Sequence, residues 1–150
     1  MISSDPVDFA TIYNKSLDLV SRREHSCFEL EHKLLRRYGM SSSIDDVIAK
    51  LKESRLLDDH RFAETYIQAR ARRGFGPKKI FIELKQRGLQ ESIINSGLAS
   101  IENWNELALA AFHKKFTKFS NQINEILKAK NFLQNRGFSF EQIEICFKET

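Results

Sequence analysis

The segment LKQRGL at residues 84–89 has two altered copies elsewhere in the chain, LRRYGM at 35–40 and LQNRGF at 133–138. Their glycines follow one another at intervals of 49 residues, at Gly39, Gly88 and Gly137. A glycine after a basic or polar cluster is typical of a helix C-terminus, because glycine adopts a positive φ easily and cations complement the helix dipole. The three segments therefore predict three equivalent helix ends in a threefold repeat.

Each glycine is flanked by helical patterns. A short amphipathic helix should follow it, with an apolar pair four residues apart: Val47 and Leu51, Ile94 and Leu98, Ile143 and Phe147. The preceding helix should begin at Ser26 in the first copy, where Glu29 completes a capping box, and at Gly76-Pro77 in the second, with the core pairs Leu30/Leu34 and Ile80/Leu84. A further helix should start at Asp5-Pro6, at Asp58 or Asp59, and near Asn103.

These patterns predict an all-α protein. Prolines and glycines are few, no segment alternates in the manner of a strand, and apolar residues recur at helical spacing, as in Phe9, Tyr13, Leu17 and Val20, or Phe62, Tyr66 and Ala69. We expect three tandem three-helix repeats, at 1–57, 58–102 and 103–150. Since none buries much surface alone, they should stack into an elongated, curved array.

The composition is that of a folded domain, with 150 residues, 41% hydrophobic and 29% charged. The longest apolar run falls far short of the roughly 18–20 residues that span a bilayer, so no membrane segment is expected. The opening MISSDPVDF lacks the basic and apolar regions of a signal peptide. We therefore expect a cytoplasmic protein.

The residues give little support for an enzyme. Cys27 and Cys146 are far apart, with neither disulfide nor zinc spacing, and are expected to be partly buried thiols. The histidines form no metal-binding pattern, and no nucleotide-binding or nucleophile motif occurs. Asp58 and Asp59 could suggest a metal site, but adjacent residues do not share a helix face, so one of them should cap the following helix. We predict no catalytic residues, metal or cofactor.

The net charge of +4 is unevenly distributed. Residues 70–87 carry seven basic residues and one acid, and residues 113–136 carry six basic residues and one acid. Two basic runs at corresponding places of a repeat favour a polyanion or an acidic protein surface as partner. The alternative for either run is a solvated helix face.

The first run surrounds one predicted turn, GFGP at 74–77. Lys78 and Lys79 would lie at a positive helix N-terminus, which local stability does not favour and an anionic partner would. Phe75 could be exposed there and stack on a base, or it could anchor the turn in the core. Phe112, Phe116 and Phe119 are expected to be core residues rather than a stacking surface.

Residues 56–88, LLDDHRFAETYIQARARRGFGPKKIFIELKQRG, closely resemble the signature of the RecX family of bacterial recombination regulators. SRREHSCFELEHKLLRRYG at 21–39 and FLQNRGFSFEQI at 132–143 extend the resemblance over essentially the whole chain. Tyr38 departs from the usual R-G junction of the first unit. The resemblance implies a helical protein that binds the RecA–DNA filament, lies along its groove and inhibits recombination and ATP hydrolysis, in the regulation of DNA repair and the SOS response.

Two functions from different classes follow from the resemblance and the charge pattern. The first is a RecA-filament regulator, expected to be a monomer; the alternative is a nucleic-acid-binding helical protein without sequence specificity, which would bind single- or double-stranded DNA through phosphates. The candidate partner-binding residues are the same for both: Arg70, Arg72, Arg73, Phe75, Lys78, Lys79, Lys85, Arg87, Lys114, Lys115 and Lys118.

Overall fold

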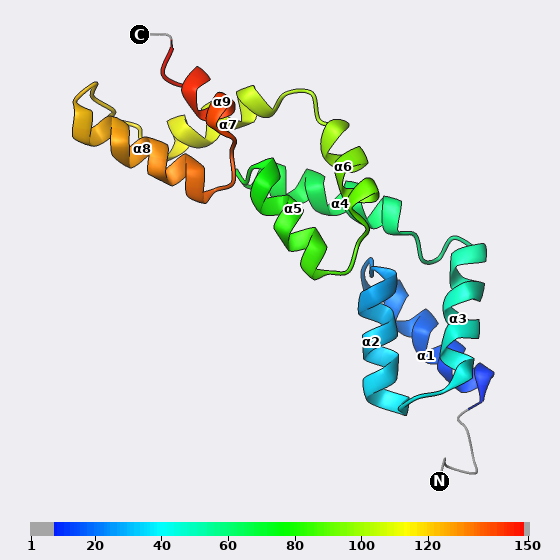
Figure 1. The fold of residues 1–150 in the computed structure, drawn as a ribbon. Helices are drawn as coiled ribbons and strands as arrows, with labels where there is room; N and C mark the ends of the chain where they lie inside the picture. The colour runs from blue at the N-terminus through cyan, green and yellow to red at the C-terminus, as the bar shows by residue number, and fades with distance from the viewer. Residues whose placement is uncertain (1–7, 149–150) are drawn as a thin grey trace. The chain divides into compact units, whose positions relative to one another are not determined.

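The computed structural model describes residues 8–148, which form nine helices and no strand (Figure 1). The helices are α1 (Phe9–Arg22), α2 (Cys27–Tyr38), α3 (Ser42–Glu53), α4 (Asp59–Arg72), α5 (Pro77–Gln86), α6 (Glu91–Ala99), α7 (Trp104–Lys115), α8 (Ile123–Asn135) and α9 (Phe140–Ile145). The all-α prediction is confirmed. Within the described ranges, no helix has the length and apolar character needed to cross a membrane.

The chain divides into two compact units. One comprises the chain up to Phe62 together with Arg87–Leu89, and the other comprises Ala63–Gln86 together with the chain from Gln90 onward. In the first unit, α1, α2 and α3 pack against one another; in the second, α5 packs on α6, and α7, α8 and α9 form a group. The repeat boundaries after residues 57 and 102 stay a prediction.

Most predicted helix starts are confirmed. Ser26 and Glu29 form the expected capping box at α2, Pro77 is the first residue of α5, and Asn103 precedes α7. The start at Asp5-Pro6 is wrong, since α1 begins at Phe9 and the Asp8 carboxylate accepts a hydrogen bond of 2.8 Å from the Thr11 amide. Asp5 and Pro6 themselves lie outside the described residues.

The adjacent aspartates at the start of α4 cap two different helices. The Asp58 carboxylate accepts hydrogen bonds from the amides of His60 (2.9 Å) and Arg61 (3.2 Å) at the start of α4. The Asp59 carboxylate accepts one of 2.9 Å from the amide of Cys27, the first residue of α2. Asp58 therefore caps the following helix, as predicted for one of the two aspartates, whereas the cap that Asp59 provides to α2 was not predicted.

The three repeated glycines all have positive φ, as predicted: 74° at Gly39, 81° at Gly88 and 98° at Gly137. Gly39 follows directly after Tyr38, the last residue of α2, whereas Gly88 and Gly137 each lie one residue further from their helices. At Gly88, the position of a Cβ atom is already occupied by the side chain of Phe28. Glycine is needed there for space as well as for φ.

In the first unit, the core is built from all three helices and the segment after α3. It contains both predicted pairs, Leu30/Leu34 and Val47/Leu51, together with Ile12, Ile44 and Leu57. In α1, the fully buried residues are Ile12 and Ser16. Of the predicted stripe, Tyr13, Leu17 and Val20 lie at the edges of this core, and Phe9 is exposed. The register of α1 is thus shifted by one residue from the prediction.

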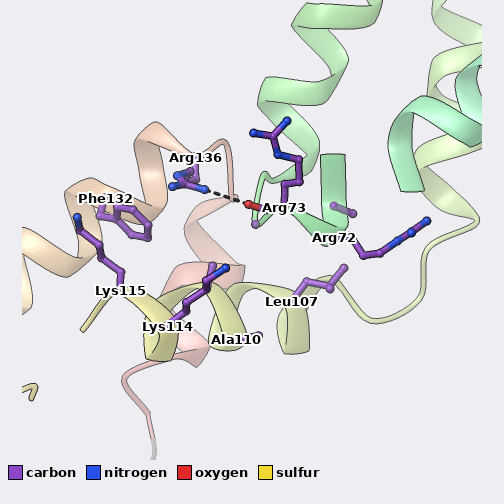
Figure 2. Close-up of a pocket in the computed structure, with 11 residues that line it drawn as sticks. Arg72, Arg73, Leu107, Ala110, Lys114, Lys115, Phe132 and Arg136 are labelled. Carbon is purple, nitrogen blue, oxygen red and sulfur yellow. Dashed lines mark hydrogen bonds between the residues drawn. The ribbon is translucent and has the colours of Figure 1, made fainter. Parts of the chain in front are cut away.

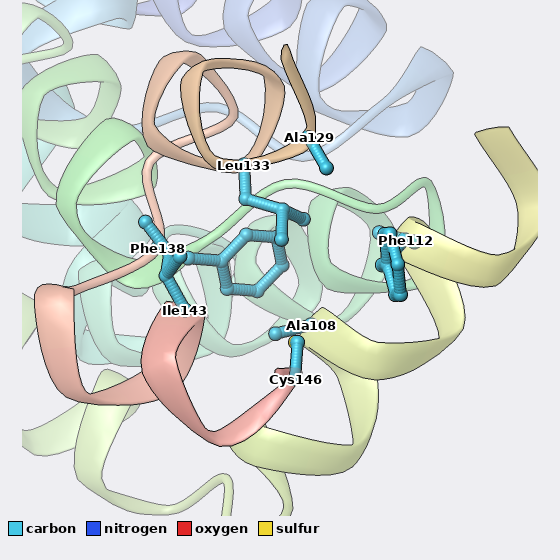
Figure 3. Close-up of a cluster of buried hydrophobic side chains, with 8 residues drawn as sticks. Ala108, Phe112, Ala129, Leu133, Phe138, Ile143 and Cys146 are labelled. Carbon is cyan, nitrogen blue, oxygen red and sulfur yellow. The ribbon is translucent and has the colours of Figure 1, made fainter. Parts of the chain in front are cut away.

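In the second unit, one cluster joins α7, α8 and α9 (Figure 3). Phe112 is buried in this cluster and Phe116 and Phe119 pack against it, which confirms their predicted core role. In α4 the buried residues are Phe62, Ala63, Ile67 and Ala71. Ala69, predicted to be on the buried face, is exposed.

Candidate functional site

The turn after α4 is held against the end of α8. The amide of Gly76 donates to the carbonyl of Arg136 (2.7 Å), and the amide of Lys78 donates to the carbonyl of Gly137 (2.9 Å). A Cβ on Gly76 would lie 2.5 Å from the Gly137 carbonyl carbon, and one on Gly137 would lie 2.5 Å from the Lys79 amide nitrogen. Backbone meets backbone here, so Gly76 and Gly137 form a tight junction within the unit.

Beside this junction lies a pocket of about 290 Å³ between the end of α4 and the facing helices α7 and α8 (Figure 2). We call it the basic pocket. Its polar side chains are all cations: Arg72, Arg73, Lys114, Lys115 and Arg136. The rest of its lining is apolar and consists of Ala71, Gly74, Leu107, Ala110, Ala111 and Phe132.

The cations of the basic pocket are not neutralised by acidic side chains of the described chain. No acidic residue lines the pocket, and none of its five cations pairs with a carboxylate of the described chain. Arg136 is held in place by a hydrogen bond of 3.2 Å from Nη1 to the Arg73 carbonyl, and Figure 2 shows Arg72 extending away from the other cations. An unpaired set of cations around an apolar floor attracts an anion.

Arg70 is a predicted site residue whose charge is paired within the fold. Its guanidinium donates to the Glu83 carboxylate through Nε (2.9 Å) and Nη2 (2.6 Å), and the Tyr66 hydroxyl donates to the same carboxylate (2.8 Å). Burial alone would raise the pKa of Glu83, but these hydrogen bonds hold its pKa below the ordinary value. The pair joins α4 to α5, so Arg70 has a structural role in this fold.

Phe75 is half-buried and is covered by cations. The Arg70 guanidinium carbon lies 3.7 Å from the ring centroid and that of Arg136 lies 4.7 Å away, with Lys79 Nζ at 5.5 Å. Such cation–π contacts stabilise the arginines above the ring. The geometry favours the anchoring alternative for Phe75 over stacking on a base.

The other predicted residues lie in various places. Lys85 pairs with Glu91 at 3.3 Å, and Arg87 Nε lies 3.9 Å from a Glu29 carboxylate oxygen. Lys78 lines a separate apolar pocket with Phe81 and Ile82, and Lys118 is exposed between α7 and α8. Of the eleven predicted residues, the basic pocket therefore brings together Arg72, Arg73, Lys114 and Lys115.

Arg136 was missing from the predicted site residues, although it belongs to the second basic run. Its position directly before Gly137 predicts only a residue at a helix C-terminus. Arg87, which precedes Gly88 in the same way, has the same predicted position. The sequence signal that could have identified Arg136 is its place at a helix end in the repeat that follows the basic turn at 74–77.

The two thiols of the described residues are not activated, and these residues form no metal centre. Burial raises the pKa of the thiols of Cys27 and Cys146 to about 11, so both are protonated near neutral pH and are poor nucleophiles. Over residues 8–148, no three His, Cys, Asp or Glu side chains come close enough to hold a metal ion.

Two family models match the chain. Residues 13–51 match the first three-helix domain of RecX, and residues 58–98 match its second three-helix domain. Among curated proteins, the "Regulatory protein RecX" of Legionella pneumophila strain Corby is 35% identical over 139 residues, 91% of this chain and 93% of that protein. That of Halorhodospira halophila is 37% identical over 134 residues, 88% of this chain and 83% of that protein.

Solved structures agree on the fold. The crystal structure of RecX from Lactobacillus salivarius matches with a TM-score of 0.82 over 94% of this chain and 95% of that one, at 24% sequence identity. A second crystal structure, described as regulatory protein RecX, matches with a TM-score of 0.80 over 94% of this chain and 72% of that one. The helical arrangement is thus shared where only a quarter of the residues are.

Proposed function

This chain belongs to the RecX family of regulatory proteins, and on that premise we propose that it binds the RecA recombinase filament and inhibits its recombinase and ATPase activities. RecX is a regulatory family and not a family of enzymes, so an effect on ATP hydrolysis is exerted on RecA. We propose further that the protein acts as a cytoplasmic monomer, and that three repeats, 1–57, 58–102 and 103–150, form its array.

One observation supports a location for the filament contact. The two basic runs meet in the basic pocket, where Arg72 and Arg73 lie across from Lys114 and Lys115, more than forty positions further along the sequence. Since none of these four cations pairs with a carboxylate of the described residues, they favour binding to an anionic partner. The proposed contact surface is therefore the basic pocket, and Lys78, Lys79 and Lys118, from the same two basic runs, are further proposed contacts.

The experiment compares two variants that each lose two arginines and two lysines. The pocket variant carries Arg72→Ala, Arg73→Ala, Lys114→Ala and Lys115→Ala. The control carries Arg36→Ala, Arg37→Ala, Lys50→Ala and Lys52→Ala, which are exposed and lie in the last turns of α2 and α3. Both variants lose the same net charge, and the control loses favourable helix-dipole interactions of the same kind.

The readouts are RecA-promoted strand exchange and the DNA-dependent ATP hydrolysis of RecA. The pocket variant should need at least about 10-fold more protein for half-inhibition, which corresponds to about 1.4 kcal/mol of binding free energy. The control should stay close to wild type. Exposed substitutions of this kind rarely cost more than about 0.5 kcal/mol of stability, and circular dichroism checks that both variants remain helical. Equal inhibition by the two variants would contradict the proposed surface.

The same unpaired cations favour a second candidate, direct binding of single- or double-stranded DNA through phosphates. Direct binding should weaken steeply as salt rises, in proportion to the number of phosphates neutralised. Inhibition of RecA through a protein contact should persist at salt concentrations where binding to free oligonucleotide is lost. Inhibition that disappears together with oligonucleotide binding would support the DNA-binding alternative.

A further inference from the structure

The residues that line the basic pocket limit the chemical class of anion that it can bind. The inference drawn from them rests on the proposed function. Its side chains offer hydrogen-bond donors and positive charge only, since no Asp, Glu, Asn, Gln, Ser or Thr lines it. A nucleobase presents donors as well as acceptors at its edges, and those donors would find no side-chain acceptor here. Carboxylates and phosphates, which only accept, match the lining.

The apolar part of the pocket does not suit a stacked base. Its one aromatic side chain, Phe132, already has the Arg136 guanidinium carbon 4.8 Å from its ring centroid and Lys115 Nζ at 5.9 Å. Sequence-tolerant binding of single strands depends on free aromatic faces. The remaining floor, from Leu107 and the alanines, is aliphatic and suits an aliphatic side chain.

We propose that the basic pocket binds an acidic peptide segment of a protein partner, with one aliphatic side chain on the floor and neighbouring carboxylates on the surrounding cations. The pocket volume of about 290 Å³ is just below the roughly 300–1,000 Å³ of small-molecule sites, so the pocket has room for an anchoring side chain. An apolar anchor surrounded by charge-complementary contacts is the usual anatomy of a protein–protein interface centre.

The pocket is formed before any partner binds. Arg136 is fixed by its bond to the Arg73 carbonyl and by its contacts with Phe75 and Phe132. The Gly76–Gly137 junction holds the turn that carries Arg73 against the end of α8. A preformed pocket loses little conformational entropy on binding, which favours recognition of a short segment.

The test uses the full chain and three fluorescein-labelled probes of equal net charge: a short Asp/Glu peptide with a central leucine, the same peptide with serine instead of leucine, and an oligothymidylate. Fluorescence anisotropy measures the dissociation constants. The leucine peptide should bind at least about 10-fold more tightly than the serine peptide, because one buried leucine side chain contributes that much. It should also bind more tightly than the oligothymidylate.

The variant Ala110→Phe fills the pocket without removing any charge, because Ala110 is exposed and lies on the apolar floor. It should abolish the preference for leucine over serine. The matched control is Ala69→Phe, an exposed alanine of α4 outside the pocket lining, and it should keep that preference.

Equal binding of the leucine and serine peptides would overturn the inference. The inference would also be overturned if the oligothymidylate bound more tightly than either peptide and lost affinity in the Ala110→Phe variant. The pocket would then be a nucleic-acid site. RecA inhibition is measured separately. If Ala110→Phe loses peptide binding yet inhibits RecA like wild type, the pocket has no part in inhibition. The proposed function itself fails only if the wild-type protein does not inhibit RecA.

Discussion

Gly76 and Gly137 are packed so closely that a Cβ atom on Gly76 would lie 2.5 Å from the carbonyl carbon of Gly137. Since Gly76 is not among the residues with positive φ, its need for glycine is steric. The contact is between backbones, which cannot rotate away as a flexible side chain can. This junction sets the position of the turn that bears Arg73.

The variant Gly76→Ala should lose about 1–3 kcal/mol of stability, the usual cost of overpacking. Chemical denaturation measures the loss. Gly39→Ala serves as the comparison, because nothing lies within 4 Å of its Cβ position and its cost comes from φ alone. Retained stability in Gly76→Ala would show that the junction can open.

At Gly88, two costs should add. The variant Gly88→Val places a β-branched residue at φ 81°, where the backbone strain is on the order of 1–2 kcal/mol or more, and its Cβ meets the Phe28 side chain. In a Phe28→Ala background the cost should fall without vanishing, because the backbone term remains. Thermal unfolding of the four proteins separates the terms, and a Gly88→Val protein as stable as wild type would refute the left-handed assignment.

The Glu83 carboxylate gives a pH-dependent contribution to stability. Its pKa is lowered in the folded protein from the ordinary 4.5, so the unfolded chain binds the proton more tightly. Stability from Glu83 is therefore fully present above pH 4.5 and is lost as the pH falls through the lower folded value. Glu83→Gln should be less stable than wild type at pH 7, with a flatter pH profile below 4.5 in denaturation experiments.

His25 should give a second pH dependence at a higher pH. The residue is 2% exposed, with Nδ1 donating to the Arg23 carbonyl (3.1 Å) and Nε2 accepting from Lys33 Nζ (2.8 Å). Burial lowers the pKa of His25 below 6.5, so stability is lost as the pH falls from 6.5 through the folded value. His25→Ala should be less stable at pH 7.5 and should lose this slope. An unchanged slope would contradict the assignment to His25.

Much of the fold could be predicted from local signals. Capping boxes, a proline at a first helical position and glycines at helix ends are encoded within a few residues, so the starts of α2 and α5 and the φ of Gly88 followed from the sequence. The buried face of α4 did not. Alanine carries little hydrophobic signal, so only the neighbours present in the fold distinguish buried Ala63 and Ala71 from exposed Ala69.

The sequence predicted that the candidate site is positively charged but not which of its basic side chains lie together. The basic runs were visible, but the sequence could not show that Arg70 pairs with Glu83 while Arg73 and Lys114 line one pocket. That difference depends on how α4 faces α5 and α7, which is a property of tertiary packing. The contact of Phe75 with Arg136, a residue sixty-one positions away, likewise depends on tertiary packing.

The two aspartates at the start of α4 bear on how the chain can be cut into fragments. A fragment that ends at residue 57, the predicted end of the first repeat, would lack the carboxylate of Asp59 that caps α2. It would also lack Arg61, whose guanidinium binds the Glu24 carboxylate through Nε (2.8 Å) and Nη2 (3.1 Å). A fragment that preserves the first three helices should therefore extend at least to Phe62, so the smallest viable piece overlaps the start of the next repeat.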